Sequence, residues 1–199
     1  MKELNNLSNK KIAIYGGSFN PIHIGHLLTG FDIIEKLGYE HIIYIPANIP
    51  VHKDSSGFPE PSHRLKMLNL SIKYTKFFLS SDIEIKRGGL TYTYDTVEEL
   101  TKLLNYKAKF GVVFGDDLLA GLNKWKNIDS LQNICELICL KRDLSTKENI
   151  PYKITYLKNR VFSISSTEIR ERVKSNLSID YMVTKEVKNY IVRKKLYRV

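Results

Sequence analysis

The chain has 199 residues, 43% of them hydrophobic, and a formal net charge of +10 at pH 7. This apolar content can bury one core, and the lack of an internal repeat, a linker or a long apolar run excludes a repeat array and a membrane-spanning protein. We therefore predict one soluble, cytoplasmic domain over residues 1–199 without a membrane partner, with a polar N-terminal extension at 1–10 and helices at 165–199.

Apolar runs of strand length alternate with amphipathic helical patterns along the chain. Near-continuous apolar runs are typical of parallel strands that are covered on both faces. Strands are predicted at residues 11–17, 41–47, 77–85, 109–115, 136–142, 152–158 and 161–165, and helices at 26–38, 62–74, 95–104, 166–175 and 184–194. This alternation predicts an α/β fold with a doubly wound, Rossmann-like parallel sheet in three α/β/α layers, which binds ligands beyond the carboxyl ends of its strands.

Several local signals refine these elements. Ser62 is expected to cap the helix that follows it, and the spacing of Asp95 and Glu98 matches a capping box. Residues 48–62 are rich in Pro, Gly and Ser and are long for a connection in a compact domain, which indicates a substrate loop or lid. Cys135 and Cys139 lie in an apolar strand and are interpreted as buried free thiols.

The positive charge indicates an anionic partner. The lysines of the chain are scattered rather than grouped, apart from the run Arg193-Lys194-Lys195. Aromatic motifs of the kind that bind RNA bases are absent from the sequence. We therefore expect small anionic ligands rather than a nucleic acid, since a positive field concentrates such ligands near the protein.

The stretch GGSFNPIHIGH at residues 16–26 directly follows the first predicted strand. Gly16 and Gly17 allow a close backbone approach or a sharp turn. His23 and His26 are three residues apart, so both lie on one side of the first helical turn, where the helix N-terminus favours an anion. The stretch matches neither the dinucleotide-binding GxGxxG pattern nor the P-loop, and it predicts a phosphate site of another kind.

The same stretch resembles the (T/H)xGH motif of a nucleotidyltransferase superfamily, and further segments resemble one family within it, the nicotinate mononucleotide adenylyltransferases. These segments are NIPVHK at 48–53, Arg64 with Met67, LTYTYDTVEEL at 90–100, VFGDDLLAGLNKW at 113–125, ISSTEIRERV at 164–173 and the tail VKNYIVRKKLY. The resemblance covers residues 11–198 in the family's order. Asn20 stands where the family often has Asp, and Leu90 replaces a Ser, which leaves one contact to the pyridine ring unsupported.

The resemblance also bears on the letters HIGH at 23–26, which occur in class I aminoacyl-tRNA synthetases. Such an enzyme would need a KMSKS-type loop and tRNA-binding domains, whereas this chain has ISSTEIR late in a sequence of 199 residues. The resemblance implies instead transfer of the adenylyl group of ATP to nicotinate mononucleotide, in NAD biosynthesis, without a covalent intermediate. Mg²⁺ is implied as a companion of ATP, and no metal ligand is assigned in the protein.

The resemblance assigns roles to individual residues. His23, His26 and Arg170 are implied as the catalytic groups. The implied ATP-binding residues are Gly16, Gly17, Ser18, Phe19, His23, Gly25, His26, Gly115, Asp117, Ile164, Ser165, Ser166, Thr167 and Arg170, with Asp116 as the alternative to Asp117 for a ribose contact. The implied mononucleotide-binding residues are Asn48, Lys53, Thr93, Trp125 and Arg142.

Three alternatives stay open at this point. The acceptor could be nicotinamide mononucleotide, or the chain could be another adenylyltransferase of the superfamily, such as one that acts on phosphopantetheine. A non-catalytic nucleotide sensor or RNA-binding module is a third reading, which His23, His26 and Arg170 argue against. The oligomeric state, a homo-oligomer included, is also left open.

Overall fold

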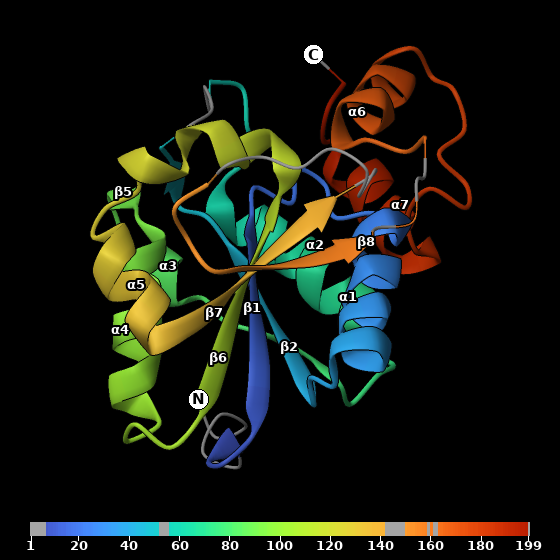
Figure 1. The fold of residues 1–199 in the computed structure, drawn as a ribbon. Coiled ribbons are helices and arrows are strands. Elements are labelled where there is room, and N and C mark those ends of the chain that lie inside the picture. The colour runs from blue at the N-terminus through green and yellow to red at the C-terminus, as the bar shows by residue number, and fades with distance from the viewer. Residues whose placement is uncertain (1–6, 52–55, 142–149, 159, 161–162, 199) are drawn as a thin grey trace.

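The computed structural model describes residues 7–51, 56–141, 150–158, 160 and 163–198 (Figure 1). Its centre is a sheet of six parallel strands in the order β4-β2-β1-β6-β7-β8. The strands are β1 (Lys11–Gly17), β2 (His41–Pro46), β4 (Phe78–Ser80), β6 (Lys109–Gly115), β7 (Cys135–Lys141) and β8 (Ile154–Lys158). The chain builds outward from β1 in one direction and then from β6 in the other, which is the doubly wound topology that the sequence predicts.

Helices cover both faces of this sheet. On one face lie α1 (Ile24–Leu37), α2 (Pro61–Ile72), α6 (Ser166–Lys174) and α7 (Lys185–Lys194), and on the other lie α3 (Ile83–Arg87), α4 (Thr93–Leu103) and α5 (Ile128–Ile134) (Figure 1). The helices on the side of α1 enclose a first hydrophobic core against the sheet, and those on the side of α4 enclose a second. Successive residues of β1 point to opposite faces, since Ala13 packs into the first core and Ile12 and Ile14 pack into the second. The three-layer α/β/α prediction is confirmed.

The predicted strand at 77–85 is only partly correct. Strand β4 ends at Ser80, and α3 begins at Ile83. The hydroxyl of Ser81 accepts a hydrogen bond from the Ile83 N–H at 3.3 Å and turns the chain into the helix. The apolar residues that suggest a longer strand, Ile83 among them, are buried in the second core as helical residues. A short apolar run fits a buried strand and a buried helical turn equally well.

Other boundaries also differ from the predictions. Helix α4 begins at Thr93 and is preceded by Tyr92, so Asp95 lies in its first turn and does not cap it. Pro61 opens α2, and Ser62 lies inside that helix. The described part of the strand predicted at 161–165 is not a strand, because Ser165 caps α6. The loop at 48–62 contributes β3 (Ile49–Pro50), which pairs with β5 (Leu90–Thr91), and the sequence reading missed α5 and the 3₁₀ helix Asp116–Lys124.

The remaining expectations concern the cysteines and the membrane. Cys135 and Cys139 are both buried, as predicted, and neither is in a disulfide. Within the described residues, no helix is long and apolar enough to span a lipid bilayer.

Candidate active site

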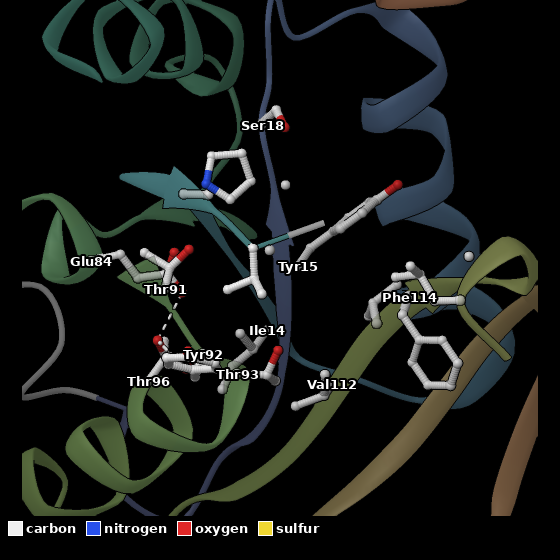
Figure 2. A pocket seen from close by; sticks show the side chains of 18 of the residues that line it. Ile14, Tyr15, Ser18, Glu84, Thr91, Tyr92, Thr93, Thr96, Val112 and Phe114 are labelled. Carbon is white, nitrogen blue, oxygen red and sulfur yellow. Dashed lines mark hydrogen bonds between the residues drawn. The ribbon is translucent and has the colours of Figure 1, made fainter. Parts of the chain in front are cut away.

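A cavity of about 550 Å³ opens at the carboxyl ends of β1 and β6, the two strands from which the chain winds in opposite directions (Figure 2). Ile14, Tyr15 and Ser18 line it from β1 and the loop that follows, and Val112 and Phe114 line it from β6. Loops that leave neighbouring strands in opposite directions leave a crevice between them, which is the usual ligand site of such sheets. The volume lies within the range of about 300–1,000 Å³ typical of small-molecule sites.

The glycine-rich loop after β1 forms one wall. Gly16, Gly17, Ser18 and Phe19, which the resemblance implies as ATP-binding residues, all line the cavity. A Cβ on Gly17 would lie 3.1 Å from the Phe19 ring, whereas one on Gly16 would meet nothing within 4 Å. The open space at Gly16 therefore lets a ligand approach the backbone closely.

The two predicted histidines stand at the start of α1. The imidazole rings of His23 and His26 are 3.7 Å apart, and Nδ1 of His26 accepts a hydrogen bond from the backbone N–H of His23 at 3.2 Å. A neutral His26 with this contact carries its proton on Nε2. A Cβ on Gly25 would lie 3.0 Å from Nδ1 of His23, so a glycine is needed for the His23 ring to fold over the helix start.

Burial sets the protonation of His23. It lowers the pKa of His23 to about 4, so this imidazole is neutral at pH 7. Nδ1 of His23 is buried and has no hydrogen-bond partner among the described residues. His26 lines the cavity and His23 stands behind it. His23 therefore offers a neutral imidazole rather than a fixed positive charge at the helix N-terminus.

The late motif of residues 164–170 is fastened to the loop that precedes α1. Ser166 donates to the Pro21 carbonyl at 2.9 Å, and the Arg170 guanidinium donates to the Asn20 carbonyl at 2.9 Å and to Thr167 at 3.2 Å. Ser165 caps α6 by accepting from the Glu168 N–H at 3.1 Å. Of the predicted residues in this motif, Ser166 lines the cavity, and the others, Ile164, Ser165, Thr167 and Arg170, do not.

The predicted mononucleotide residues fall into three groups. Thr93, at the first turn of α4, and Trp125, whose ring packs edge-on against Phe114 with centroids 5.4 Å apart, both line the cavity. Asn48 does not line it, because its side-chain amide donates to the Gly89 carbonyl at 3.1 Å. Lys53 and Arg142 lie outside the described residues.

The two acidic neighbours after β6 are distinguished by position. Asp117 lines the cavity and Asp116 does not. The Asp117 carboxylate folds back over Gly115, where a Cβ would collide with its Oδ1. Its negative charge, added to the effect of burial, raises the pKa of Tyr15 across the cavity. Gly115 and Asp117 thus lie together at the end of β6, as the sequence predicts.

Two buried charged residues near the cavity are missing from the predicted site. Arg64 is 1% exposed, and its guanidinium donates to the carbonyls of Ser18 at 2.9 Å and Asn48 at 3.1 Å. Arg64 therefore joins the glycine-rich loop to the loop at 48–50. Its place on an apolar helix face was a signal in the sequence that could have identified it. Glu84 is 7% exposed and lines the cavity. It was hidden because its segment was interpreted as a strand.

Comparison with known proteins agrees with this geometry. A family described as cytidylyltransferase-like matches residues 14–172. The nicotinate-nucleotide adenylyltransferase of Bacillus subtilis (strain 168) is 36% identical over 188 residues, which cover 94% of this chain and 98% of that protein. The probable nicotinate-nucleotide adenylyltransferase of Fusobacterium nucleatum is 38% identical over 187 residues, which cover 91% and 96%.

A solved structure shares the fold. The nicotinic acid mononucleotide adenylyltransferase of Plasmodium falciparum, complexed with NaAD, superposes with a TM-score of 0.75 at 24% identity, covering 94% of this chain and 97% of that one. The family match spans most of the sheet and the motifs at 16–26 and 164–170, and the relatives are similar over nearly their full length. The chain therefore belongs to the cytidylyltransferase-like nucleotidyltransferases and, within them, to the nicotinate-nucleotide adenylyltransferases.

Proposed function

We propose that this chain transfers the adenylyl group of ATP to nicotinate mononucleotide, which yields nicotinate adenine dinucleotide and pyrophosphate in NAD biosynthesis. The observation that carries the proposal is the composition of one cavity. Its first wall holds the glycine-rich loop and His26, which suit a polyphosphate, and its second holds Thr93 and Trp125, which suit a pyridine ring. Two substrates held in one crevice react as if they belonged to a single molecule.

The chemistry needs no protein nucleophile and no general base. A phosphate oxygen of the mononucleotide, already an anion at pH 7, attacks the α-phosphorus of ATP in line with the leaving group. A new phosphoanhydride bond forms as the bond from the α-phosphorus to the bridging oxygen breaks, and pyrophosphate leaves with that electron pair. The protein's task is then to position two anions and to stabilise the charge of the transition state.

His23 and His26 are proposed to supply that stabilisation. A neutral imidazole presents its N–H as a hydrogen-bond donor without the cost of burying a cation. The backbone N–H contact to Nδ1 of His26 fixes that ring's tautomer, so its Nε2–H is a donor toward the cavity. We propose that both rings donate to phosphate oxygens of ATP, with donation strongest as negative charge builds on the leaving group.

Arg170 and the hydroxyls of residues 165–167 are proposed as a second phosphate contact. In this structure Arg170 and Ser166 hold the loop that leads to His23. Thr167 is exposed, and the N-terminus of α6 favours an anion. The motif therefore has two roles in the proposal, one in fastening the glycine-rich loop and one in receiving phosphate when ATP is bound.

At the mononucleotide end, Trp125 is proposed to stack on the pyridine ring. Thr93 and the N–H groups of the first turn of α4 are proposed to receive the ring's carboxylate, and Asp117 to accept from a ribose hydroxyl. Asn48 is proposed to hold the loop through Gly89, and Lys53 and Arg142 stay proposed as mononucleotide-binding residues. Gly115 and Ile164 are proposed to line the nucleotide, the former through its backbone.

Mg²⁺ is proposed to arrive with ATP. The described residues contain no group of three His, Cys, Asp or Glu side chains that could hold a metal ion. A magnesium ion on a nucleotide needs few protein ligands, because phosphates and water supply the rest. The Asn20 amide fits such an ion, since it is 2% exposed, lines the cavity and has neither polar atom hydrogen-bonded within the described part of the chain. When bound, the ion neutralises charge on the leaving pyrophosphate.

The test is pyrophosphate release from ATP and Mg²⁺, with nicotinate mononucleotide and nicotinamide mononucleotide in parallel. We expect release with the acid to be much faster than with the amide. Comparable rates would keep the reaction and remove the selectivity. Release with neither, but with phosphopantetheine, would replace the proposed acceptor.

A further inference from the structure

Glu84 is a buried carboxylate in the cavity wall that the reaction above does not use. It belongs to the short helix α3 and is 7% exposed. Its Oε1 accepts a hydrogen bond from the Thr96 hydroxyl at 2.7 Å (Figure 2). A buried carboxylate costs several kcal/mol unless it is paired or hydrogen-bonded, so its retention in a substrate cavity calls for a reason.

The hydrogen bonds around Thr96 have a fixed direction. Arg87 Nη2 donates to Thr96 Oγ1 at 2.7 Å, and a guanidinium can only donate. The hydroxyl therefore receives that bond and directs its single proton elsewhere. The Glu84 oxygen at 2.7 Å is a better acceptor than the Tyr92 carbonyl at 3.4 Å. The chain from Arg87 through Thr96 to Glu84 thus works only with an acceptor atom at position 84.

This chain of bonds fastens α3 to the start of α4. Thr96 lies in the first turn of α4 and is 2% exposed, and Arg87 also pairs with Glu99 of α4 at 3.0 Å. The segment held in this way is the wall of the cavity, because Thr91, Tyr92, Thr93, Tyr94 and Thr96 all line it. Figure 2 shows Glu84, Thr91, Tyr92, Thr93 and Thr96 on the same side of the cavity.

The charges around Glu84 are balanced by basic groups. Burial raises the pKa of Glu84, and Thr96, Arg87, Thr91 and Arg64 act against that rise. Arg64, which holds the glycine-rich loop, in turn feels the charge of Glu84. Glu84 is therefore electrostatically coupled to Arg64, which supports the wall formed by the glycine-rich loop. It is also hydrogen-bonded to Thr96 in the wall formed by α4.

We propose that Glu84 is a positioning residue for the mononucleotide: through Thr96 it sets the first turn of α4, and with it the N–H groups and hydroxyl of Thr93 that receive the pyridine carboxylate. The inference rests on the proposed function, since it assigns a support to that same pocket. Glu84 itself does not contact the reacting atoms. Its removal should weaken the capture of nicotinate mononucleotide far more than that of ATP, which binds against β1 and α1.

The test uses steady-state kinetics on the full chain with each substrate varied in turn. Glu84→Ala and Thr96→Val each remove one end of the bond, and Glu84→Gln and Thr96→Ser each keep it. Losing one partner of a buried hydrogen bond should raise KM for nicotinate mononucleotide roughly tenfold or more. KM for ATP should change by less than about twofold, and the two conservative variants should stay within about threefold of the parent.

Two controls separate positioning from general damage. Glu98→Ala makes the same truncation as Glu84→Ala at a half-exposed position of α4, where Glu98 pairs with Lys102, and it should leave both KM values unchanged. The double variant Glu84→Ala/Thr96→Val should have no higher a KM for nicotinate mononucleotide than the more impaired single variant, because both substitutions remove one shared bond. A thermal melt of each variant identifies any that is unfolded, in which case the Thr96 pair decides.

The outcomes distinguish this inference from the function on which it rests. Parent enzyme that releases no pyrophosphate with nicotinate mononucleotide defeats the proposed function. If the parent enzyme is active, three results overturn the role of Glu84 and leave the function standing. These are equal KM changes for both substrates in the variants, additive losses in the double variant, or no KM change in Glu84→Ala.

Discussion

At the scale of single residues, the site depends on how one glycine lets two imidazoles meet. Gly25 leaves room for the His23 ring, which lies against the His26 ring at the start of α1. An alanine there would place its Cβ 3.0 Å from Nδ1 of His23 and push that ring aside. The letters HIGH therefore describe a geometry, in which the first histidine caps the helix and the second faces the cavity.

Replacing the second histidine should slow the reaction without unfolding the protein. His26→Ala removes an N–H donor aimed at developing negative charge, and such donors contribute roughly 10²–10³ in kcat. We expect kcat to fall at least about 100-fold. The measurement is pyrophosphate release at saturating substrates, with a circular dichroism spectrum to show that the fold is intact.

His41→Ala serves as the matched control for that variant. His41 begins β2, at the opposite end of the strands from the cavity, and it should retain parental turnover. A folded His26→Ala enzyme with near-normal turnover would exclude His26 from the mechanism.

The half-buried first histidine, His23, should make stability depend on pH. Its pKa is about 4 in the folded protein, against an ordinary value near 6.5 in the unfolded chain. Between these values the unfolded state binds more protons, so the free energy of unfolding falls as the pH drops from about 6.5 toward 4. With the ring only partly shielded from solvent, we expect a loss of about 1–2 kcal/mol over that window.

Urea denaturation of the parent and of His23→Asn at several pH values isolates this contribution. The variant lacks the titrating imidazole, so its stability should decline less over the same window. Parallel curves for the two proteins would show that His23 titrates normally in the fold.

At the scale of elements, the sequence predicted best where an element is long and buried. Strands β1, β2, β6 and β7 follow apolar runs that match the predictions within a residue or so, because strands covered on both faces must be apolar throughout. Helices α1 and α7 were found from amphipathic spacing. These elements fix the sheet order and therefore the place of the cavity.

The short elements around the cavity were predicted less well. In the segment at 77–85, only Ser81 and Asp82 separate strand β4 from helix α3, which carries Glu84 and Arg87. A buried helical turn and a buried strand share one composition. The start of α4 was predicted at the wrong residue. The apparent capping box at Asp95 competes with interactions from other elements, such as the hydrogen bond from Thr96 to Glu84. Contacts of this kind join residues from different elements, so no local pattern reveals them.

The candidate site shows the same division. The resemblance names Gly16, His26, Thr93 and Trp125 from contiguous motifs, and all four line one cavity, where their binding roles stay predictions. Arg64 and Glu84 support the walls from behind, and their partners are backbone carbonyls or a distant threonine. Whether the chain is one domain, as its length predicts, stays a prediction.

At the scale of the whole molecule, charge should help to gather the substrates. The net charge is +10, and both substrates and both products are anions. Lys124 and Lys126 line the cavity on either side of Trp125, and Lys126 is held by Asp95 at 2.7 Å. A positive rim raises the local concentration of anions and is screened over a Debye length of about 10 Å at 0.1 M salt.

Kinetics at increasing NaCl should therefore show a rise in KM for both substrates, with kcat affected much less. Between about 50 mM and about 500 mM salt we expect the KM values to rise several-fold, because screening weakens capture but not the contacts inside the cavity. Lys124→Gln should flatten this dependence, whereas Lys194→Gln, at the end of α7 and away from the cavity, should not. Equal slopes of KM against salt in the two variants would mean that attraction comes from the overall charge of the molecule and not from the rim. A KM that does not change with salt would mean that the excess lysines serve another purpose.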